Sequence, residues 1–545
     1  MILLFFLFAD LNSVKAEESY SEELELNWLP NGDYQIAFNF DFSFEKLVNE
    51  PKIRNIHNHF DRFPKVVHDF MEEHFVNEFH LSLTQGIWRY KQFGYPKTGA
   101  NPTGAELWIW FGQGHADNQW DLAVNSLAGF FCASLNFMSG AFSGTPTRVL
   151  RPYSQHHERL NSSTMKYSNL PSENICTENL TPWKKLLPCE VSSGFVQLLN
   201  ANQLFNSKYM SIDVNAYKTC VSETDCSSIE NKMTMTVNVV FDGFRIRDYS
   251  RTLSLLTLFH KPMGKVCPLA DRTSISAQSY KKDCSIVIST KGDLVKSETL
   301  ALTQEDRYSD VNFDRKCHEG EISQSNDEKI TKAPILVHKY LSSGIDGEER
   351  IVCQVSNELQ EEVTVGYLDL VPWHFRLLVH TLEVTNSENS RIEPSFLHYV
   401  PSQDRERPST LQLEFKMAPG ETVEIAVKIR KVLLKWTEHP PDPHHGHFCG
   451  PSMVYLDIHN QTYKIYSEPL IIQLMVPDFS MPYNVLCLSS TIMTIGYSAA
   501  QTLATKRYTF VSKKTGKGKL SLKITALKEK VLSLFKRKSK EEKTE

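Results

Sequence analysis

Residues 482–504 (PYNVLCLSSTIMTIGYSAAQTLA) contain no charged side chain, and no other feature restricts the fold of this chain so strongly. As a helix, the segment would be about 34 Å long, enough to cross a bilayer hydrocarbon core of about 30 Å. A buried helix of a water-soluble domain is the alternative. The flanking charge favours a span, because residues 505–545 contain 14 Lys and Arg but 4 Asp and Glu, whereas residues 1–504 carry a net charge of −15. Since basic flanks stay in the cytosol, we expect a transmembrane helix at 482–504, a basic cytosolic tail at 505–545 and a body across the membrane.

The predicted span is poor in Leu and rich in small and hydroxylated residues. Gly496 and Ala500 form a small-xxx-small pair, which lets helices approach closely in a membrane. We therefore expect this helix to pack against helices of other subunits in a membrane complex.

The first residues, MILLFFLFADLNSVKA, contain an apolar run of the length found in the core of a signal peptide. Val14 and Ala16 occupy the positions of the small residues before a cleavage site. A buried N-terminal strand is the alternative. We predict a signal peptide at residues 1–16, which places the body in an oxidising compartment.

Disulfides are expected in such a compartment, and the chain has 11 cysteines. Cys132 lies in an apolar run and is predicted to be a buried free thiol, while Cys220 and Cys226 are close enough for a short bridge. Cys176 has polar neighbours, which leaves three roles open: a local bridge, a nucleophile, or a bond to another chain. The adjacent Glu178 disfavours the thiolate that a nucleophile needs.

Three sequences match the acceptor pattern for N-linked glycans in a lumenal domain. They are Asn161 (NSS), Asn460 (NQT) and Asn179 (NLT). Pro182 follows the last triplet directly and restricts its backbone, which makes Asn179 the weakest of the three.

The hydrophobic patterns predict a mainly β protein with some α-helix. An N-terminal lumenal α/β region is expected at 17–230, with a helix at 63–79 and a long loop at 140–193, followed by a C-terminal lumenal β-sandwich region at 231–480. In the latter, residues 410–436 (TLQLEFKMAPGETVEIAVKIRKVLLKW) predict a β-hairpin with its turn at Ala418–Glu421, where Gly420 can take a positive φ. Residues 301–332 are polar and charged, and are predicted to be an exposed insertion.

The sequence contains no recognisable catalytic motif of the nucleophile-elbow, phosphate-loop or zinc-protease kind. The segment HPPDPHHGHFC clusters His439, His444, His445, His447 and Cys449, but lacks a second ligand pair at zinc-finger spacing. We therefore expect no catalytic residue, metal or cofactor, and the acidic body argues against nucleic acid as a partner.

Several long segments resemble the class T subunit family of the glycosylphosphatidylinositol (GPI) transamidase. They include HLSLTQGIWR (80–89), LAGFFCASLNF (127–137), ICTENLTPWKKLLPC (175–189), LLKWTEHPPDPHHG (433–446) and VPDFSMPYNVLCL (476–488). The matching segments occur in the family's order and end at the predicted span.

The resemblance implies a non-catalytic subunit of an endoplasmic-reticulum membrane complex that transfers precursor proteins to a GPI lipid. It implies a caspase-like catalytic partner, the class K subunit, with other subunits, and contact with GPI lipid and precursor through the complex. It also implies that Cys176, in the C-T-E-N motif, forms a disulfide with that catalytic subunit.

Cys189, Cys220, Cys226 and Cys267 lie in segments that resemble the family and are the candidates for internal disulfides. Cys284, Cys317, Cys353 and Cys449 match no family feature, which leaves their pairing open. Two other functions remain as alternatives: a single-pass cell-surface receptor of the adhesion or lectin type, and a lumenal hydrolase.

Overall fold

The computed structural model divides the chain into two units, residues 1–476 and residues 477–545. It describes residues 18–47, 60–97, 99–112, 114–148, 164–189, 193–221, 228–245, 253–280, 284–290, 293–294, 299–303, 310–317, 332–343, 348–440, 442–458, 461–506 and 523–530. The predicted signal peptide therefore lies outside the described residues.

The N-terminal part of the first unit is built on a sheet that has nine strands in the described residues; we call it the first sheet. Its order is β12 (Thr299–Ala301), β9 (Arg272–Ser279), β1 (Glu18–Trp28), β2 (Tyr34–Leu47), β7 (Ser228–Phe241), β6 (Tyr209–Cys220), β3 (Val76–Gln85), β4 (Gly104–Phe111) and β5 (Thr164–Leu170). Neighbouring strands are antiparallel except β1 and β9, which are parallel. On β2, every second residue from Ile36 to Phe44 is a buried apolar side chain, as the two-residue period of a strand requires.

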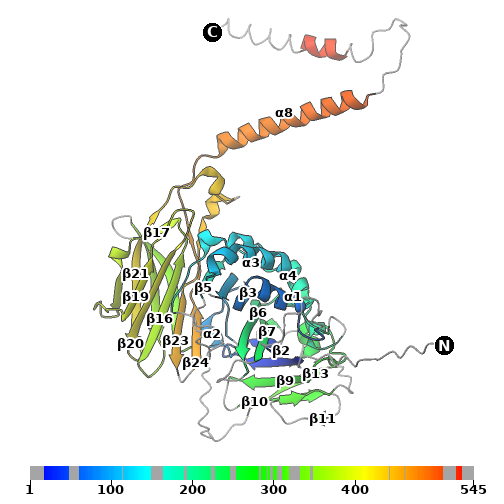
Figure 1. Cartoon of the computed structure of the whole chain (residues 1–545), viewed down its shortest axis with the longest axis vertical. Coiled ribbons are helices and arrows are strands. Elements are labelled where there is room, and N and C mark those ends of the chain that lie inside the picture. Colours follow the sequence, from blue (N-terminus) through cyan, green and yellow to red (C-terminus); the bar gives the residue numbers. More distant parts are fainter. Residues whose placement is uncertain are drawn as a thin grey trace, which may run out of the picture. The chain divides into compact units, whose positions relative to one another are not determined.

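Helices cover one face of the first sheet (Figure 1). The longest are α1 (Lys65–Glu73), α3 (Ala116–Phe131) and α4 (Thr177–Lys184). Shorter helices of this part of the chain are α5 (Ala201–Leu204), α7 (Leu255–Phe259), η1 (Leu135–Phe137), η2 (Gly140–Phe142) and η4 (Phe195–Leu198), whereas the short α2 (Tyr90–Phe93) packs with the sandwich core. On α3, Trp120, Val124, Leu127 and Phe131 are buried at three- and four-residue spacing, which is the apolar stripe of a helix on a core. We call α1, α3 and α4 together the helical face.

The C-terminal part of the first unit is an antiparallel β-sandwich. One sheet is β14 (Ile335–Ser343), β15 (Glu349–Asn357), β21 (Thr422–Lys431) and β17 (Phe375–Leu377), with β18 (Glu383–Asn386) also on β21. The other is β19 (Phe396–Val400), β20 (Ser409–Met417), β16 (Val363–Val371), β23 (Met453–Ile458) and β24 (Gln461–Tyr466). Buried apolar residues of both sheets share one core, as in a sandwich. The fold is therefore mainly β, as expected.

Two small sheets complete the first unit. One contains β11 (Asp293–Leu294), β10 (Cys284–Thr290), β13 (Val311–Cys317) and β8 (Leu253–Ser254), and the other pairs β22 (His447–Cys449) with β25 (Leu470–Ile472). Short 3-10 turns lie at η5 (Val379–Thr381), η6 (Trp436–Glu438) and η7 (Pro443–His445).

Four expectations from the sequence differ from this structure. The boundary expected between 230 and 231 falls inside β7, because the first sheet continues to β9 and β12. The helix expected at 63–79 ends at Glu73, and β3 begins at Val76. The loop expected at 140–193 contains β5 and α4. The expected insertion at 301–332 contains β13, which pairs with β10 and buries Val311 and Phe313.

The prediction of a hairpin at 410–436 is wrong. β20 and β21 are consecutive strands joined by a turn in which Gly420 has φ +69°. However, β20 pairs with β16 and β19, whereas β21 pairs with β15, β17 and β18 in the opposite sheet. The segment therefore crosses from one sheet of the sandwich to the other.

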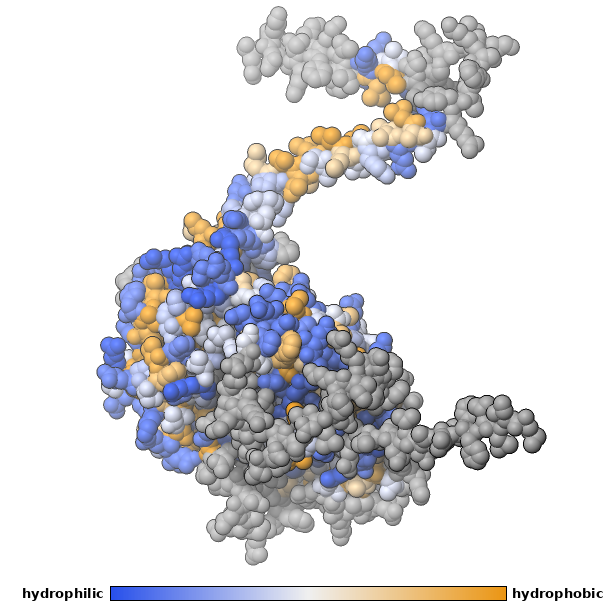
Figure 2. All heavy atoms as spheres, viewed as in Figure 1, coloured by the Kyte–Doolittle hydropathy of each residue, from blue (hydrophilic) through white to orange (hydrophobic). Residues whose placement is uncertain are grey.

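The second unit contains α8 (Ser480–Thr505), and the helix expected at 482–504 lies within it. Its side chains are exposed, and Figure 2 shows hydrophobic residues along its length. Hydroxyl groups of α8 donate to carbonyl oxygens one turn earlier, as Thr491 does to Cys487 at 2.6 Å and Thr494 to Ser490 at 2.8 Å. In the described part of the chain, no helix is both long and apolar enough to cross a membrane.

A buried carboxyl group joins the first sheet to the sandwich. Glu106 on β4 is fully buried, and its two oxygens accept hydrogen bonds from the hydroxyls of Tyr167 on β5 (3.1 Å) and Tyr466 on β24 (3.0 Å). Around it, Trp108 packs with Leu370 and Met453 in an apolar cluster shared by both parts. The first sheet and the sandwich thus share a polar contact enclosed by apolar side chains.

Tyr466→Phe removes one of these donors and leaves a buried carboxyl oxygen without it. We expect the free energy of unfolding to fall by about 1–3 kcal/mol, measured by chemical denaturation of the full-length protein in detergent. Tyr463→Phe is the control, because that hydroxyl donates to the exposed Gln461. If both variants lose the same free energy of unfolding, the hydrogen bond to Glu106 contributes no more to stability than the hydrogen bond to Gln461.

Candidate functional site

Cys176 is the residue immediately before α4. Its backbone is extended (φ −140°, ψ 177°), and its N–H donates to Oδ1 of Asn179 at 2.8 Å. The thiol also donates to this oxygen at 3.1 Å. Cys176 and Asn179 therefore form the first and fourth positions of a capping box, in which the side chain at the fourth position accepts from the backbone of the first.

Asn179 also joins α4 to the end of α3. Its side-chain N–H groups donate to the carbonyl oxygens of Phe131 (3.0 Å) and Cys132 (2.9 Å). These carbonyls belong to the last turn of α3 and the residue after it, where helical partners are missing. Cys132 has the left-handed conformation (φ 50°) that ends α3. The C-T-E-N sequence thus positions Cys176 by binding α4 to α3 through a single amide.

The inner side of α4 is fixed in the core. Trp183 is 1% exposed, packs on Phe40 at 6.1 Å between ring centroids, and donates from Nε1 to the Asp213 carbonyl oxygen at 3.1 Å. Lys184 donates to the Leu199 carbonyl oxygen, and burial, with the charge of Lys261 as a smaller cause, lowers the pKa of Lys184 to about 8. Cys176 is therefore carried by a short helix that contacts the core on its inner side.

Cys176 is a half-buried free thiol, and Cys132 beside it is an exposed free thiol. The expectation that Cys132 is a buried filler is wrong, because the left-handed turn at the end of α3 directs it outward. Cys353 and Cys449 are free but fully buried, and burial raises the pKa of these thiols to about 12 and about 11. In the described part of the body, the accessible free thiols are thus at the α3–α4 junction.

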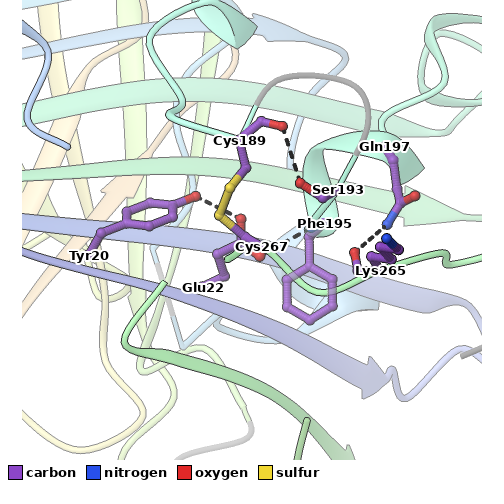
Figure 3. Close-up of a disulfide and its surroundings, with 8 residues drawn as sticks. All are labelled: Tyr20, Glu22, Cys189, Ser193, Phe195, Gln197, Lys265 and Cys267. Atoms are coloured by element: carbon purple, nitrogen blue, oxygen red, sulfur yellow. Dashed lines mark hydrogen bonds between the residues drawn. A yellow bond between two sulfur atoms is a disulfide. The ribbon is translucent and has the colours of Figure 1, made fainter. Parts of the chain in front are cut away.

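The disulfide between Cys189 and Cys267 fixes the chain that follows α4 (Figure 3). Both residues were internal candidates. Cys220 and Cys284 are also disulfide-bonded, and Cys226 lies outside the described residues. Beside the bridge, Gly194 has φ +72°, and a Cβ there would lie 2.5 Å from a carboxyl oxygen of Glu22. Only glycine fits this approach.

Glu22 is a buried carboxyl group next to this disulfide (Figure 3). It accepts from the Tyr20 hydroxyl at 2.7 Å and from the Phe195 N–H at 3.2 Å. Burial raises the pKa of Glu22 to about 7, although both hydrogen bonds oppose the shift. The same burial, followed by the charge of Glu22, raises the pKa of Tyr20.

The structure buries Asn179 to 1% exposure and engages its amide with three backbone groups. A glycan on this nitrogen would displace those contacts, so the expectation of an acceptor at Asn179 is corrected. Asn161 and Asn460 lie outside the described residues, and both stay predictions.

The histidine-rich segment does not converge on one point. His439 and His447 approach each other, with ring centroids 5.8 Å apart, but Cys449 turns inward and its sulfur lies 3.8 Å from Nζ of Lys339. His444 is exposed in η7. Within the described residues, no three His, Cys, Asp or Glu side chains are arranged to hold a metal.

An apolar cavity of about 220 Å³ opens between the three helices of the helical face. Val66 on α1, Phe130 on α3 and Leu186 after α4 are among its walls. Val66 is 47% exposed and Phe130 is 40% exposed. The sequence pattern does not predict this cavity, although Phe130, an apolar residue outside the buried stripe of α3, is a signal for exposed apolar surface there. Exposed apolar surface of this kind marks interaction sites.

The family model described as "Gpi16 subunit, GPI transamidase component" matches residues 3–251 and 244–532. The chain belongs to this family. It is 31% identical over 540 residues to the GPI-anchor transamidase component PIGT of Mus musculus, covering 92% of this chain and 91% of that protein.

Two further relatives extend the match. The human GPI-anchor transamidase component PIGT is 31% identical over 545 residues, with 92% of each chain covered. The Saccharomyces cerevisiae GPI transamidase component GPI16 is 27% identical over 582 residues, with 95% of this chain and 94% of that protein covered. The resemblance found in the sequence is therefore confirmed, and this Gpi16-family chain belongs to GPI-anchor biosynthesis as a component of an enzyme complex.

The hydrogen bonds of Asn179 predict how the stability of α4 changes when the side-chain nitrogen of this residue is replaced by oxygen. Asn179→Asp keeps an acceptor for the Cys176 N–H but cannot donate to the two carbonyls of α3. We expect the free energy of unfolding to fall by about 1–3 kcal/mol. We also expect the backbone amides of α4 to exchange hydrogen faster, which mass spectrometry measures. Asn202→Asp, at an exposed side chain of α5, is the control. Unchanged exchange in α4 of the Asn179 variant would contradict this account.

Glu22 predicts a dependence of stability on pH. Its folded pKa, about 7, lies above the ordinary value of 4.5, so the folded protein binds this proton more tightly than the unfolded chain. The resulting stabilisation is complete below 4.5 and is lost as pH rises through about 7. Relative to Glu22→Gln, the wild type should lose on the order of 2–3 kcal/mol of unfolding free energy between about pH 5 and about pH 8.

Chemical denaturation across this range measures the effect. Glu23→Gln is the matched control, because Glu23 is the next residue on β1 and its side chain points to the other face of the strand. The control should keep the pH slope of the wild type. If Glu22→Gln keeps the wild-type slope of unfolding free energy against pH, the slope arises from other titratable groups.

Proposed function

We propose that this chain is a non-catalytic subunit that stabilises the GPI transamidase and is joined by a disulfide at Cys176 to the caspase-like catalytic subunit. The accessibility of Cys176 carries the proposal. The free thiols found in the described part of the body are either buried or lie at the α3–α4 junction, and Cys176 is held there by the capping contacts. Family membership favours this function over the cell-surface receptor.

The surroundings of Cys176 support attachment rather than catalysis. Its hydrogen-bond acceptor is the carboxamide oxygen of Asn179, which cannot take the thiol proton as a general base would. Cys353 and Cys449 are enclosed in the core with raised thiol pKa values, so they are poor nucleophiles. The chemistry of the complex therefore belongs to its partner subunit.

We further propose that the body lies in the lumen of the endoplasmic reticulum and that the basic tail lies in the cytosol. In this topology α8 crosses the membrane, although its small and hydroxylated residues make it less apolar than the criterion for a span requires. The absence of charge in residues 482–504 and the basic residues after α8 support this topology. The hydroxyls of α8 that donate to its own carbonyls need no water, which suits packing against other helices.

The disulfide and the apolar helical face would act together. A covalent link makes further contact with the partner intramolecular, so even a small surface binds at high effective concentration. The cavity between α1, α3 and α4 supplies apolar surface on the same helices that position Cys176. Loss of the disulfide should therefore weaken assembly without abolishing it.

Cys176→Ser tests the link. We expect membrane extracts run on non-reducing gels to contain a heavier band that disappears on reduction and is absent from this variant. Mass spectrometry should find a caspase-like protease in that band. Co-purification of the protease should fall but persist, because the non-covalent surface remains.

Cys132→Ser is the matched control, since it removes the neighbouring exposed thiol and should keep the heavier band. A heavier band that is lost from Cys132→Ser and retained in Cys176→Ser would show that Cys132, and not Cys176, forms the bond. A monomer in every lane would overturn the disulfide, and complete loss of co-purification in Cys176→Ser would overturn the role of the non-covalent surface.

A further inference from the structure

A cleft of about 310 Å³ lies where the first sheet meets the sandwich, away from Cys176. Its walls come from the end of β1, the start of β2, the segment after α2, the end of β9 and β24. The volume is within the range of sites for small ligands, about 300–1,000 Å³. The proposed attachment to a partner does not use this cleft.

The walls combine aromatic rings with uncharged amides. Trp28, Tyr95 and Tyr463 supply rings, while Asn27, Gln278 and Gln461 supply carboxamides. Lys97 is the charged residue among the described lining residues. Its Nζ lies 2.7 Å from a carboxyl oxygen of the buried Glu25, so the carboxylate balances the positive charge of Lys97. A wall of this kind does not attract phosphate or another anion, because its cation is already paired.

These groups complement a neutral sugar. The C–H face of a pyranose packs on an aromatic ring, and a carboxamide both donates to and accepts from hydroxyl groups. Fatty or purely apolar ligands would leave the amides without partners, which costs binding energy.

The aromatic walls are held in place before any ligand binds. Oη of Tyr95 accepts from the N–H of Lys464 at 3.2 Å, and the rings of Tyr95 and Tyr463 are 5.0 Å apart at 65°. The Tyr463 hydroxyl donates to Gln461 at 3.0 Å, and the carbonyl of Trp28 accepts from the N–H of Tyr280 at 3.1 Å. Little ordering is therefore needed on binding, which favours affinity.

A source of carbohydrate adjoins the cleft in the sequence. Gln461, a wall residue, is the middle residue of the acceptor triplet Asn460-Gln461-Thr462. Asn460 itself lies outside the described residues and directly precedes Gln461 in the sequence. A second source is an oligosaccharide carried by another molecule.

We propose that this cleft binds a neutral oligosaccharide. The aromatic and amide walls recognise the sugar, whichever source presents it. The inference is independent of the bond at Cys176, while its first source depends on a lumenal body, where N-glycans are added.

The test uses the full-length protein in detergent and a free high-mannose oligosaccharide as probe. Saturation-transfer NMR detects binding of the probe to the protein. If the chain's own glycan fills the cleft, Asn460→Gln binds the probe, the wild type does not, and the wild-type glycan resists native endoglycosidase. If the ligand is external, the wild type binds the probe as well. Either result supports the proposal.

Trp28→Leu removes one aromatic wall and, in the Asn460→Gln background, should weaken probe binding about ten-fold, which corresponds to about 1.4 kcal/mol. Trp436→Leu is the matched control, because Trp436 is 53% exposed outside the cleft. Gln278→Ala provides a second variant at the wall if Trp28→Leu fails to fold.

The proposal is overturned if neither the wild type nor Asn460→Gln binds the probe. It is also overturned if Trp436→Leu weakens binding as much as the wall variants do, or if an unglycosylated peptide displaces the probe completely at equal concentration.

Discussion

Glu106 lies at the centre of the contact between the first sheet and the sandwich, where its two carboxyl oxygens accept hydrogen bonds from tyrosines on opposite sides. A buried carboxyl group is costly unless such donors are present, and it constrains their positions strongly when they are. Tyr466 reaches Glu106 from β24, and the N–H of the same residue donates to the hydroxyl of Tyr90 at 3.2 Å. The orientation of β24 to the first sheet is thereby restricted, and the walls of the cleft depend on that orientation.

The helical face depends on the same sheet from its other side. Asn179 connects α4 to α3, Trp183 connects α4 to β2 and β6, and the Cys189–Cys267 bridge holds the chain that follows. The half-buried thiol of Cys176 thus lies at the start of a helix that is held to the core by hydrogen bonds, by the packing of Trp183 and by the disulfide that follows. Such a support suits a role in assembly, because the geometry offered to a partner changes little when the bond forms.

Part of this arrangement was predictable from the sequence. Strand periodicity indicated a mainly β body, and polar neighbours with a family resemblance pointed to Cys176. Asn179 shows the limit: its triplet matches a glycan acceptor, yet a three-residue pattern carries no information on burial against α3. The predicted hairpin at Gly420 failed for a related reason. A turn residue specifies a reversal of the chain, but tertiary packing decides whether the next strand joins the same sheet or the opposite one.

The parallel pairing of β1 with β9 has a consequence for biosynthesis. Ser21 on β1 is aligned with Arg272 on β9, so the edge of β1 remains unpaired until about half of the 545 residues have been synthesised. The Cys189–Cys267 bridge must wait for nearly the same length of chain. An open strand edge is a template for pairing with other chains. Synthesis of this protein therefore includes an interval in which the edge of β1 is open to other chains, and the pairing of β9 with β1 ends that interval.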